Sequence, residues 1–173
     1  APRPADRLFS PHIGASPIVQ SGPDMPLANR RVTGRCLECG DPILLCYCEM
    51  ANFKNYKIAF DREVFVSSAT DEEMRLYEAA IGAQSAALAE IHPGVPSEVP
   101  HLAAEEVYRS AGYDASYRIG RSIGCSLVER PELKRGDRTP LREGMVLGID
   151  GGIIVPGSFA ARIGDTVLVT ETG

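Results

Sequence analysis

The stretches YRIGRSIGCSLVERPELKRGD (residues 117–137) and REGMVLGIDGGIIVPGSFAARIGDTVLVTETG (residues 142–173) decide the fold of this chain. Glycines bracket residues 120–124, and a glycine lets the backbone approach a neighbouring strand closely. The second stretch contains apolar runs separated by Gly, Pro or Asp, a pattern typical of strands joined by turns. These runs are Met145–Ile149, Ile153–Val155 and Thr166–Val169.

Charged residues occur in these two stretches where the expected strands meet their turns. Strands that deliver charged side chains to one place are a common way to build a site on a rigid scaffold. Exposed turn residues are the alternative interpretation for each of them. The residues in question are Arg121, Glu129, Asp150, Arg162 and Asp165.

Length and composition predict one ordinary globular domain. The chain has 173 residues, enough to bury a core, and a net charge of -5, which argues against a nucleic-acid-binding surface. Its sequence contains neither an apolar run long enough for a bilayer nor a secretion signal at residues 1–15. We therefore expect a cytoplasmic protein, with an irregular segment at 1–15 and a single domain at 16–173.

The first half of the chain predicts strands and loops. Ser16–Gln20 is expected to be a short strand and residues 21–31 a loop rich in Gly, Pro and Asn. Ile43–Cys48 follows a turn at residues 40–42, and Tyr56–Val66 reads as a further strand that carries Asp61, Arg62 and Glu63.

Two helices are expected in the middle of the chain. Thr70 and Glu73 have the spacing of a capping box, and the first helix should end before His92-Pro93-Gly94. The second should run from about Ser97 to Gly112, a good C-cap position. Apolar spacing predicts the buried faces. These are Met74, Tyr77, Ile81, Leu88 and Ile91 on the first helix, and Val99, Leu102, Ala103 and Val107 on the second.

The order of strands, two helices and strands predicts an α+β fold, with helices on one face of a mostly antiparallel sheet. A weak internal sequence similarity supports a fold made of two similar halves. Residues 37–44 (LECGDPIL) and 141–148 (LREGMVLG) both read as a turn followed by a strand.

Several motifs resemble the creatinase, aminopeptidase P and methionine aminopeptidase family, which has the pita-bread fold. The helical stretch TDEEMRLYEAAIGAQSAALAEIHPGVPSEV resembles its central helices. The segments GRSIG, LREGMVLGIDGG and ARIGDTVLVTETG resemble its GHGIG, L-x-x-GMV…EPG and R-I-E-D-T-V-L-V-T-E-x-G motifs. The resemblance covers residues 16–173, with the family's opening helices absent and the first half of the fold shortened.

The resemblance implies a two-metal peptidase site, which this sequence does not reproduce. In the family, two Asp, one His and two Glu hold two ions that activate a water. The corresponding positions here are Glu49, Ala59 (or the nearby Asp61), Arg121, Asp150 and Gly164, and two further family histidines fall at Val128 and Asn29. A guanidinium repels cations, so we expect no dinuclear metal, no cofactor and metal-independent action.

The remaining charged residues suggest two versions of the former metal pocket. In one, Arg121 neutralises Asp150 and Glu49 as an internal salt-bridge network. In the other, carboxylates act as catalytic bases while arginines and polar side chains bind a small substrate. The catalytic candidates are Asp150, Glu49 and Asp61, and the substrate-binding candidates are Arg121, Arg162, Asn29, Arg62 and Glu129.

Four cysteines lie within thirteen positions, as Cys36-x-x-Cys39 and Cys46-x-Cys48. Their spacing is compatible with a zinc knuckle or a redox pair. Cys46 and Cys48 also alternate along an expected strand, where small thiols usually fill the core. Packing is the interpretation we favour, with zinc and redox chemistry as alternatives.

Two function classes follow. The first is a divergent, metal-independent Xaa-Pro aminopeptidase- or creatinase-like protein that acts on or binds a small amide or amino-acid-like substrate. The second is an inactive pseudoenzyme that serves as a binding or assembly module. An open pocket with unpaired charges would favour the enzyme, and a pocket closed by Arg121 and Asp150 would favour the module. As partners we expect a small molecule, no nucleic acid and no membrane, and a homodimer or a chain that supplies the missing helices.

Overall fold

The computed structural model describes residues 16–27, 33–51, 54 and 56–173. Its first sheet is antiparallel, with strands β1 (Ser16–Ser21), β2 (Pro42–Ala51) and β3 (Lys57–Phe65) in the order β1-β2-β3. The three strands predicted in this half are therefore confirmed. A short 3₁₀ helix, η1 (Gly22–Asp24), follows β1 inside the predicted loop. The irregular segment expected at residues 1–15 lies outside the described residues.

Both predicted helices are present, α2 (Asp71–Ala89) and α3 (Glu98–Ser110). Thr70 caps α2, because its side chain accepts a hydrogen bond from the Glu73 amide at 3.2 Å while Glu73 accepts one from the Thr70 amide at 2.7 Å. This reciprocal pair satisfies two backbone donors at the helix start. Gly112 follows α3 with φ +85°, the left-handed conformation that a helix-ending glycine adopts readily.

The predicted buried faces of the helices are wrong in part. On α2, Met74, Ile81 and Leu88 are exposed, Tyr77 is half-buried and only Ile91, just beyond the helix end, is buried as expected. Alanines form most of the inner face of α2 instead, because their short side chains let the helix lie close to the sheet. The side chains buried on α2 are Leu76, Ala80, Ala83, Gln84 and Ala87, and those on α3 are Pro100, His101, Ala104 and Tyr108.

The last third of the chain forms a four-stranded sheet and a hairpin. The sheet has the order β5-β4-β6-β9 and the hairpin pairs β7 with β8. Predicted strands correspond to β6, β7 and β9, whereas β4, β5 and β8 were not predicted as strands. The bounds are β4 Gly120–Ser122, β5 Glu129–Leu133, β6 Val146–Ile149, β7 Gly152–Ile154, β8 Ala160–Arg162 and β9 Asp165–Leu168.

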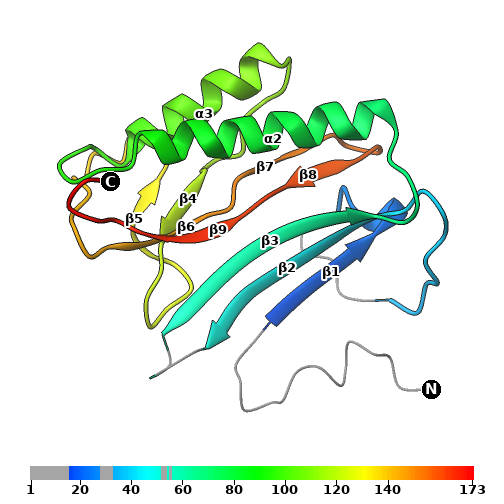
Figure 1. Ribbon diagram of the computed structural model, residues 1–173, viewed down its shortest axis with the longest axis horizontal. Helices are drawn as coiled ribbons and strands as arrows, with labels where there is room; N and C mark the ends of the chain where they lie inside the picture. The colour runs from blue at the N-terminus through cyan, green and yellow to red at the C-terminus, as the bar shows by residue number, and fades with distance from the viewer. Residues whose placement is uncertain (1–15, 28–32, 52–53, 55) are drawn as a thin grey trace.

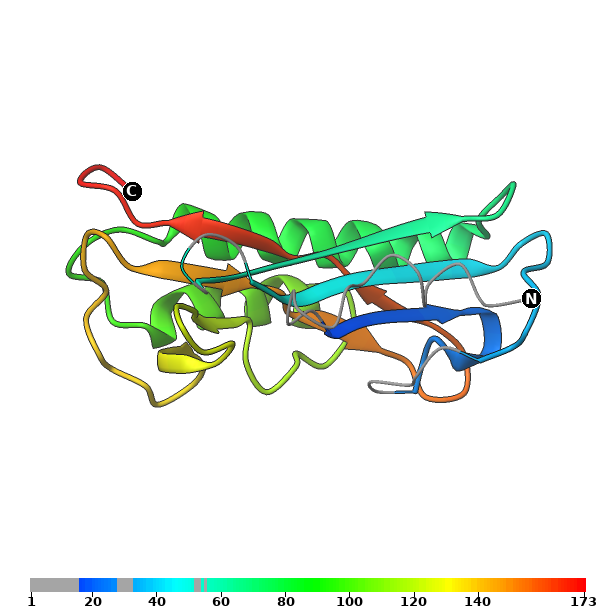
Figure 2. The same cartoon turned by 90° about the horizontal axis from the view of Figure 1, so that it is seen from below.

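Figure 1 shows both helices on one side of the strands, with α2 running along the length of the molecule. Seen from below in Figure 2, the strands of both sheets form a layer in front of the helices. The two sheets join where β3 approaches the start of β9, because the Asp61 amide donates to the Gly164 carbonyl at 3.0 Å. The helix-on-sheet α+β arrangement predicted from the sequence is confirmed, and its centre is this junction.

A close approach of strands confirms the glycine requirement predicted at residue 120. A Cβ atom on Gly120 would lie 2.5 Å from the Gly148 carbonyl oxygen, so a side chain there would force β4 and β6 apart. Within the described residues, no helix has both the length and the apolar character needed to cross a membrane.

Candidate functional site

Four charged residues meet at the junction of the two sheets. Asp61 lies in the middle of β3, Arg121 in the middle of β4, Asp150 directly after β6 and Arg162 at the end of β8. Strand alternation turns Asp61 to the buried face of β3, and the β4–β6 pairing sets Arg121 opposite Gly148. Residues that are far apart in the sequence therefore converge, as the expected site required.

Arg121 and Asp150 form a buried ion pair. Their side chains are 2% and 8% exposed, and the Arg121 guanidinium donates to Asp150 Oδ2. Arg121 Nε also donates to the Leu127 carbonyl at 3.2 Å. The guanidinium has room because Gly148 lacks a side chain: a Cβ there would lie 3.1 Å from Arg121 Nη1. This geometry matches the predicted internal salt bridge, and it leaves Arg121 too buried to bind substrate.

Arg162 connects the two carboxylates of the site. Its Nε lies 2.8 Å from Asp61 Oδ2 and donates to the Asp150 carbonyl at 3.1 Å, while Nη2 donates to Asp150 Oδ2 at 3.3 Å. Burial opposes the charge of Arg162, but Asp61 and Asp150 outweigh burial and raise the pKa of its guanidinium. With Arg121 these residues form a network in which two positive charges face two negative ones.

Burial dominates the electrostatics of the carboxyl groups on β3. It raises the pKa of Asp61, with Arg162 acting in the opposite direction, and it raises the pKa of Glu63 to about 8. Glu63 Oε1 accepts a hydrogen bond from the Arg162 amide at 2.5 Å, whereas Oε2 has no hydrogen-bond partner in the described part of the chain. Sequence reasoning missed Glu63 as a site residue, although its two-residue spacing from Asp61 places both on one strand face.

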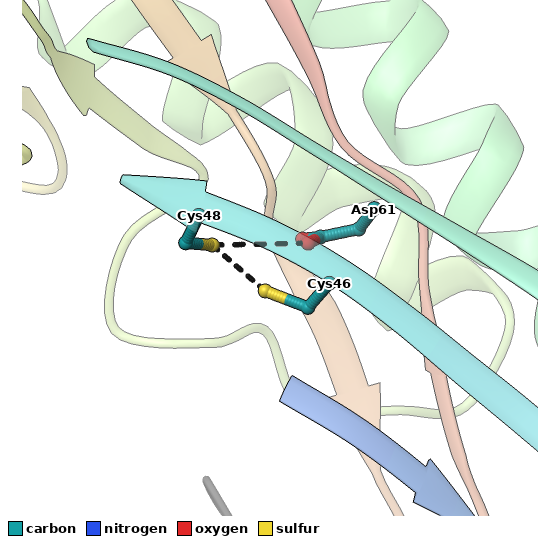
Figure 3. A group of neighbouring side chains, drawn as sticks. All are labelled: Cys46, Cys48 and Asp61. Atoms are coloured by element: carbon teal, nitrogen blue, oxygen red, sulfur yellow. Dashed lines mark hydrogen bonds between the residues drawn. The ribbon is translucent and has the colours of Figure 1, made fainter. Parts of the chain in front are cut away.

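Two thiols lie beside Asp61 on the neighbouring strand (Figure 3). The sulfurs of Cys46 and Cys48 are 2.7 Å apart, and Cys48 Sγ lies 4.0 Å from Asp61 Oδ1. A shared hydrogen bond lowers the pKa of the Cys48 thiol and raises that of Cys46. Both are buried, whereas Cys36 and Cys39 are exposed, so the four-thiol zinc grouping considered for these cysteines does not form.

A pocket of about 280 Å³ opens beside the charge network. Asp150 and Arg162 lie on its wall, and Arg162 keeps 30% of its side chain exposed. Arg118 and Tyr117 contribute a further polar edge, and most of the remaining lining is apolar. The other lining residues are Gln20, Met25, Leu27, Leu44, Ser116, Gly151, Gly152, Ile153, Ile154, Ala160 and Ala161.

Two of the other predicted site residues do not line this pocket, and the side chains of two more lie outside the described residues. Arg62 pairs with Asp165 at 2.5 Å and fastens β3 to β9. Glu129 accepts from the Ser126 amide at 2.9 Å and supports the turn after β4. The backbone of Glu49 belongs to β2, but its side chain, like all of Asn29, lies outside the described residues.

The residues at the expected ligand positions do not fit a two-metal centre. A Cβ on Gly164 would lie 2.8 Å from Asp150 Cβ and 2.9 Å from Asp61 Oδ2, so a glutamate there has no room. Arg121 brings a positive charge to the expected histidine position, and Asp150 is already paired with two guanidiniums. Among the side chains that the structure describes, the donor set is therefore too small for two divalent ions.

Comparisons with known proteins agree with this fold, and the relatives include a cyclase as well as dipeptidases. Over 144 residues the chain is 40% identical to the agropine synthesis cyclase of Rhizobium rhizogenes, covering 81% of this chain and 36% of that protein. It is 30% identical to the Xaa-Pro dipeptidase of Pyrococcus furiosus, covering 90% of this chain and 45% of that protein.

Solved structures show the same relationship. The prolidase from Pyrococcus furiosus superposes with a TM-score of 0.84 at 30% identity, over 91% of this chain and 47% of that one. The N-terminal domain of the FACT complex subunit SPT16 from chickpea, at 21% identity and a TM-score of 0.77 over 90% of this chain and 40% of that one, shares the fold.

The chain spans about a third to a half of the length of these relatives. The model of metallopeptidase family M24 matches residues 8–171, nearly the whole sequence. The pita-bread fold expected from the motifs is confirmed, and the chain is a divergent member of metallopeptidase family M24.

Proposed function

We propose that this domain acts without a dinuclear metal on a small amide or amino-acid-like substrate, and that it closes a ring within that substrate. The observation that carries the proposal is the Arg121–Asp150–Arg162 network, which occupies the expected metal position with protein charges. Because the ion pairs satisfy one another, the site needs no divalent cation to be stable.

Ring closure fits such a site better than hydrolysis does. The ions of a two-metal hydrolase generate a nucleophile from water. A cyclisation uses a nucleophile that the substrate already carries, so the enzyme has only to hold it near the electrophile. The relative with 40% identity is named as a cyclase, whereas the dipeptidase from Pyrococcus furiosus is 30% identical.

The pocket assigns roles to the residues on its wall. The exposed part of the Arg162 guanidinium would bind a carboxylate or a developing oxyanion of the substrate. Asp150 lies on the same wall and would accept the proton released by the attacking group. Asp61 would act by positioning Arg162, since it contacts that guanidinium but does not line the pocket.

The chemical outcome of the reaction tests this proposal. The full chain is incubated, with and without a chelator, with amino-acid-like amides that carry an internal hydroxyl or amine, and products are identified by mass spectrometry. Ring closure by condensation removes one water or one amine from the substrate, whereas hydrolysis adds one water. We expect the cyclised mass at a rate that the chelator does not change. Hydrolysis that the chelator abolishes would contradict the proposal.

Variants separate the roles of the two arginines on the pocket wall. Arg162→Lys keeps a positive charge but cannot reach Asp61 and Asp150 together, so it should abolish turnover and ligand-induced stabilisation. Arg118→Lys at the rim is the matched control, since Arg118 is already paired with Glu132 at 2.6 Å. It should retain most of the activity.

A binding or assembly module is the second candidate, and the closed Arg121–Asp150 pair favours it. Such a module would show no turnover on any compound and would bind a partner chain, a second copy included. Light scattering of the full chain, alone and with candidate partners, distinguishes this outcome from an enzyme whose substrate has a different structure. A ligand that raises the melting temperature through Arg162 would return the assignment to a small-molecule site.

A further inference from the structure

We propose that Cys46, Cys48 and Asp61 form a binding site for one thiophilic divalent cation of the zinc class. This site goes beyond the reaction proposed above: it uses the thiols of β2 and Asp61 Oδ1, whereas Asp61 Oδ2 contacts Arg162. Figure 3 shows the three side chains pointing toward one another from two adjacent strands. Their ligand atoms all lie within 4.8 Å of one another, and all three residues are buried.

The geometry requires only small side-chain movements to hold an ion. Ligand lengths of about 2.3 Å to sulfur and 2.0 Å to oxygen place a sulfur and an oxygen about 3.5 Å apart in a tetrahedral site. Cys48 Sγ and Asp61 Oδ1 are 4.0 Å apart. The same geometry separates two sulfurs by about 3.8 Å, so Cys46 and Cys48, now at 2.7 Å, would rotate apart by about 1 Å.

The position of the ligands on the strands supports a preformed site. Cys46 and Asp61 are directly opposite each other in the antiparallel pairing of β2 with β3. Cys48 follows two residues later on β2, which places both thiols on the face that Asp61 shares. The pairing of Cys46 with Asp61 on β3 and of Cys48 with Ser16 on β1 therefore fixes the three Cα atoms before any ion arrives.

The charges around the thiols balance when a divalent ion is bound. Two thiolates and the Asp61 carboxylate carry three negative charges, a divalent ion carries two positive ones, and Arg162 supplies the third from its contact with Asp61 Oδ2. Arg121 is neutralised separately by Asp150. Asp61 thus presents one oxygen to Arg162 and the other to the thiols, and Arg162 acts as the outer partner that orients a metal-binding carboxylate.

Thiolate ligands determine which ions the site selects. Soft sulfur donors favour Zn²⁺ and its analogues over Mg²⁺ or Mn²⁺, which prefer oxygen. An ion held here would tie β2 to β3 next to the sheet junction. We expect it to stabilise the folded chain.

Cobalt provides the direct test. The reduced full chain, freed of metal with a chelator and kept anaerobic, is titrated with Co²⁺ while absorption is recorded in the near ultraviolet and visible. We expect one Co²⁺ per chain, a thiolate-to-cobalt charge-transfer band, and displacement of cobalt by one equivalent of Zn²⁺. No charge-transfer band, or a band without saturable stoichiometry, would overturn the proposal.

Variants assign the ligands. Cys46→Ser and Cys48→Ser should each remove part of the charge-transfer band, and Asp61→Asn should weaken Co²⁺ binding at least 10-fold while the band remains. The controls are Cys36→Ser with Cys39→Ser, and Cys125→Ser, none of which should change the titration. A band that disappears only in the Cys36 and Cys39 variant would place the metal elsewhere and refute this site.

A second measurement keeps the test decisive if a serine variant fails to fold. In the wild-type chain, zinc should protect two thiols from alkylation, and a peptide map should identify them as Cys46 and Cys48. Protection that is the same with and without zinc would show that burial alone shields them and would contradict the proposal. Neither the cobalt titration nor the alkylation experiment measures turnover. Both therefore test the metal site even if the chain shows no enzymatic activity.

Discussion

At the scale of single residues, the departure from the two-metal pattern is clearest at Arg121. Arg121 replaces an expected ligand with a guanidinium, and Gly148 leaves the space that it fills. A buried charge of this kind is tolerated only when it is paired. Asp150 is the acidic residue at another of the expected ligand positions. It therefore serves first as the counter-ion of Arg121 and Arg162.

Replacement of Arg121 should show that the stability of the fold depends on this charge pairing. Arg121→Met leaves Asp150 with one guanidinium partner in a buried setting, and we expect a loss of about 3–5 kcal/mol in the free energy of unfolding. Adding Asp150→Asn should cost less than the sum of the two single changes, because the charges are coupled. Denaturant unfolding measures all three variants. Exposed Arg142→Met is the control and should change stability by less than about 0.5 kcal/mol.

Glu63 predicts a loss of stability as the pH rises from mildly acidic to mildly alkaline values. Its pKa in the folded chain is raised from 4.5 to about 8 by burial, so the folded state binds more protons than the unfolded state in that window. Stability should therefore fall as pH rises from about 4.5 to 8, by on the order of a few kcal/mol. The groups that act on Glu63 are Arg162, Asp61, Glu73 and Tyr77.

Glu63→Gln tests that sign. The amide cannot ionise, so the variant should be less sensitive to pH than the wild type and more stable than it at pH values above 8. Part of the slope will remain, because burial raises the pKa of Asp61 in the same direction. Urea unfolding at several pH values is the measurement, and parallel curves for the two proteins would refute this role of Glu63.

At the scale of elements, the caps of the helices were predictable and their buried faces were not. The Thr70–Glu73 pair is local and leaves a clear pattern in the sequence, and the structure confirms it. The buried face of α2 depends on how closely the helix approaches the sheet. Alanines allow that approach, so the larger side chains at Met74, Ile81 and Leu88 remain exposed.

One substitution on each face of α2 tests which face is buried. Ala83→Leu inserts a large side chain where the helix is fully buried and should cost about 1–3 kcal/mol. Ile81→Gln alters a side chain that is 39% exposed and should change stability by less than about 0.5 kcal/mol. Thermal and denaturant unfolding would distinguish them. A costly Ile81→Gln with a harmless Ala83→Leu would restore the face predicted from apolar spacing.

The candidate site also has a part that could be predicted from the sequence and a part that could not. Arg121, Asp150 and Arg162 could be predicted as neighbours, because each lies at the end of an apolar run or in a recognisable motif. The thiols beside Asp61 and the role of Glu63 could not, since they depend on the register between β2 and β3. That register places Cys46 opposite Asp61, and no local pattern in the sequence specifies it.

At the scale of the whole molecule, the two sheets are joined where Asp61 and Gly164 exchange backbone hydrogen bonds of 3.0 and 3.2 Å. Gly164→Ala should weaken this junction, because the new Cβ would lie 2.8 Å from Asp150 Cβ. We expect a loss of about 1–3 kcal/mol and a displaced Arg162. Gly34→Ala is the matched control, as a Cβ there meets no atom within 4 Å. Equal stability of the two variants would contradict the tight junction.

A manganese titration of the full chain shows whether protein charges replace the two ions of the family site. Mn²⁺ prefers oxygen ligands and so reports on Asp150 and its surroundings rather than on the thiols. The electron paramagnetic resonance signal of free Mn²⁺ is recorded as the ion is added to the full chain. We expect the added Mn²⁺ to stay free. Two Mn²⁺ bound per chain, and lost in Asp150→Asn, would contradict it.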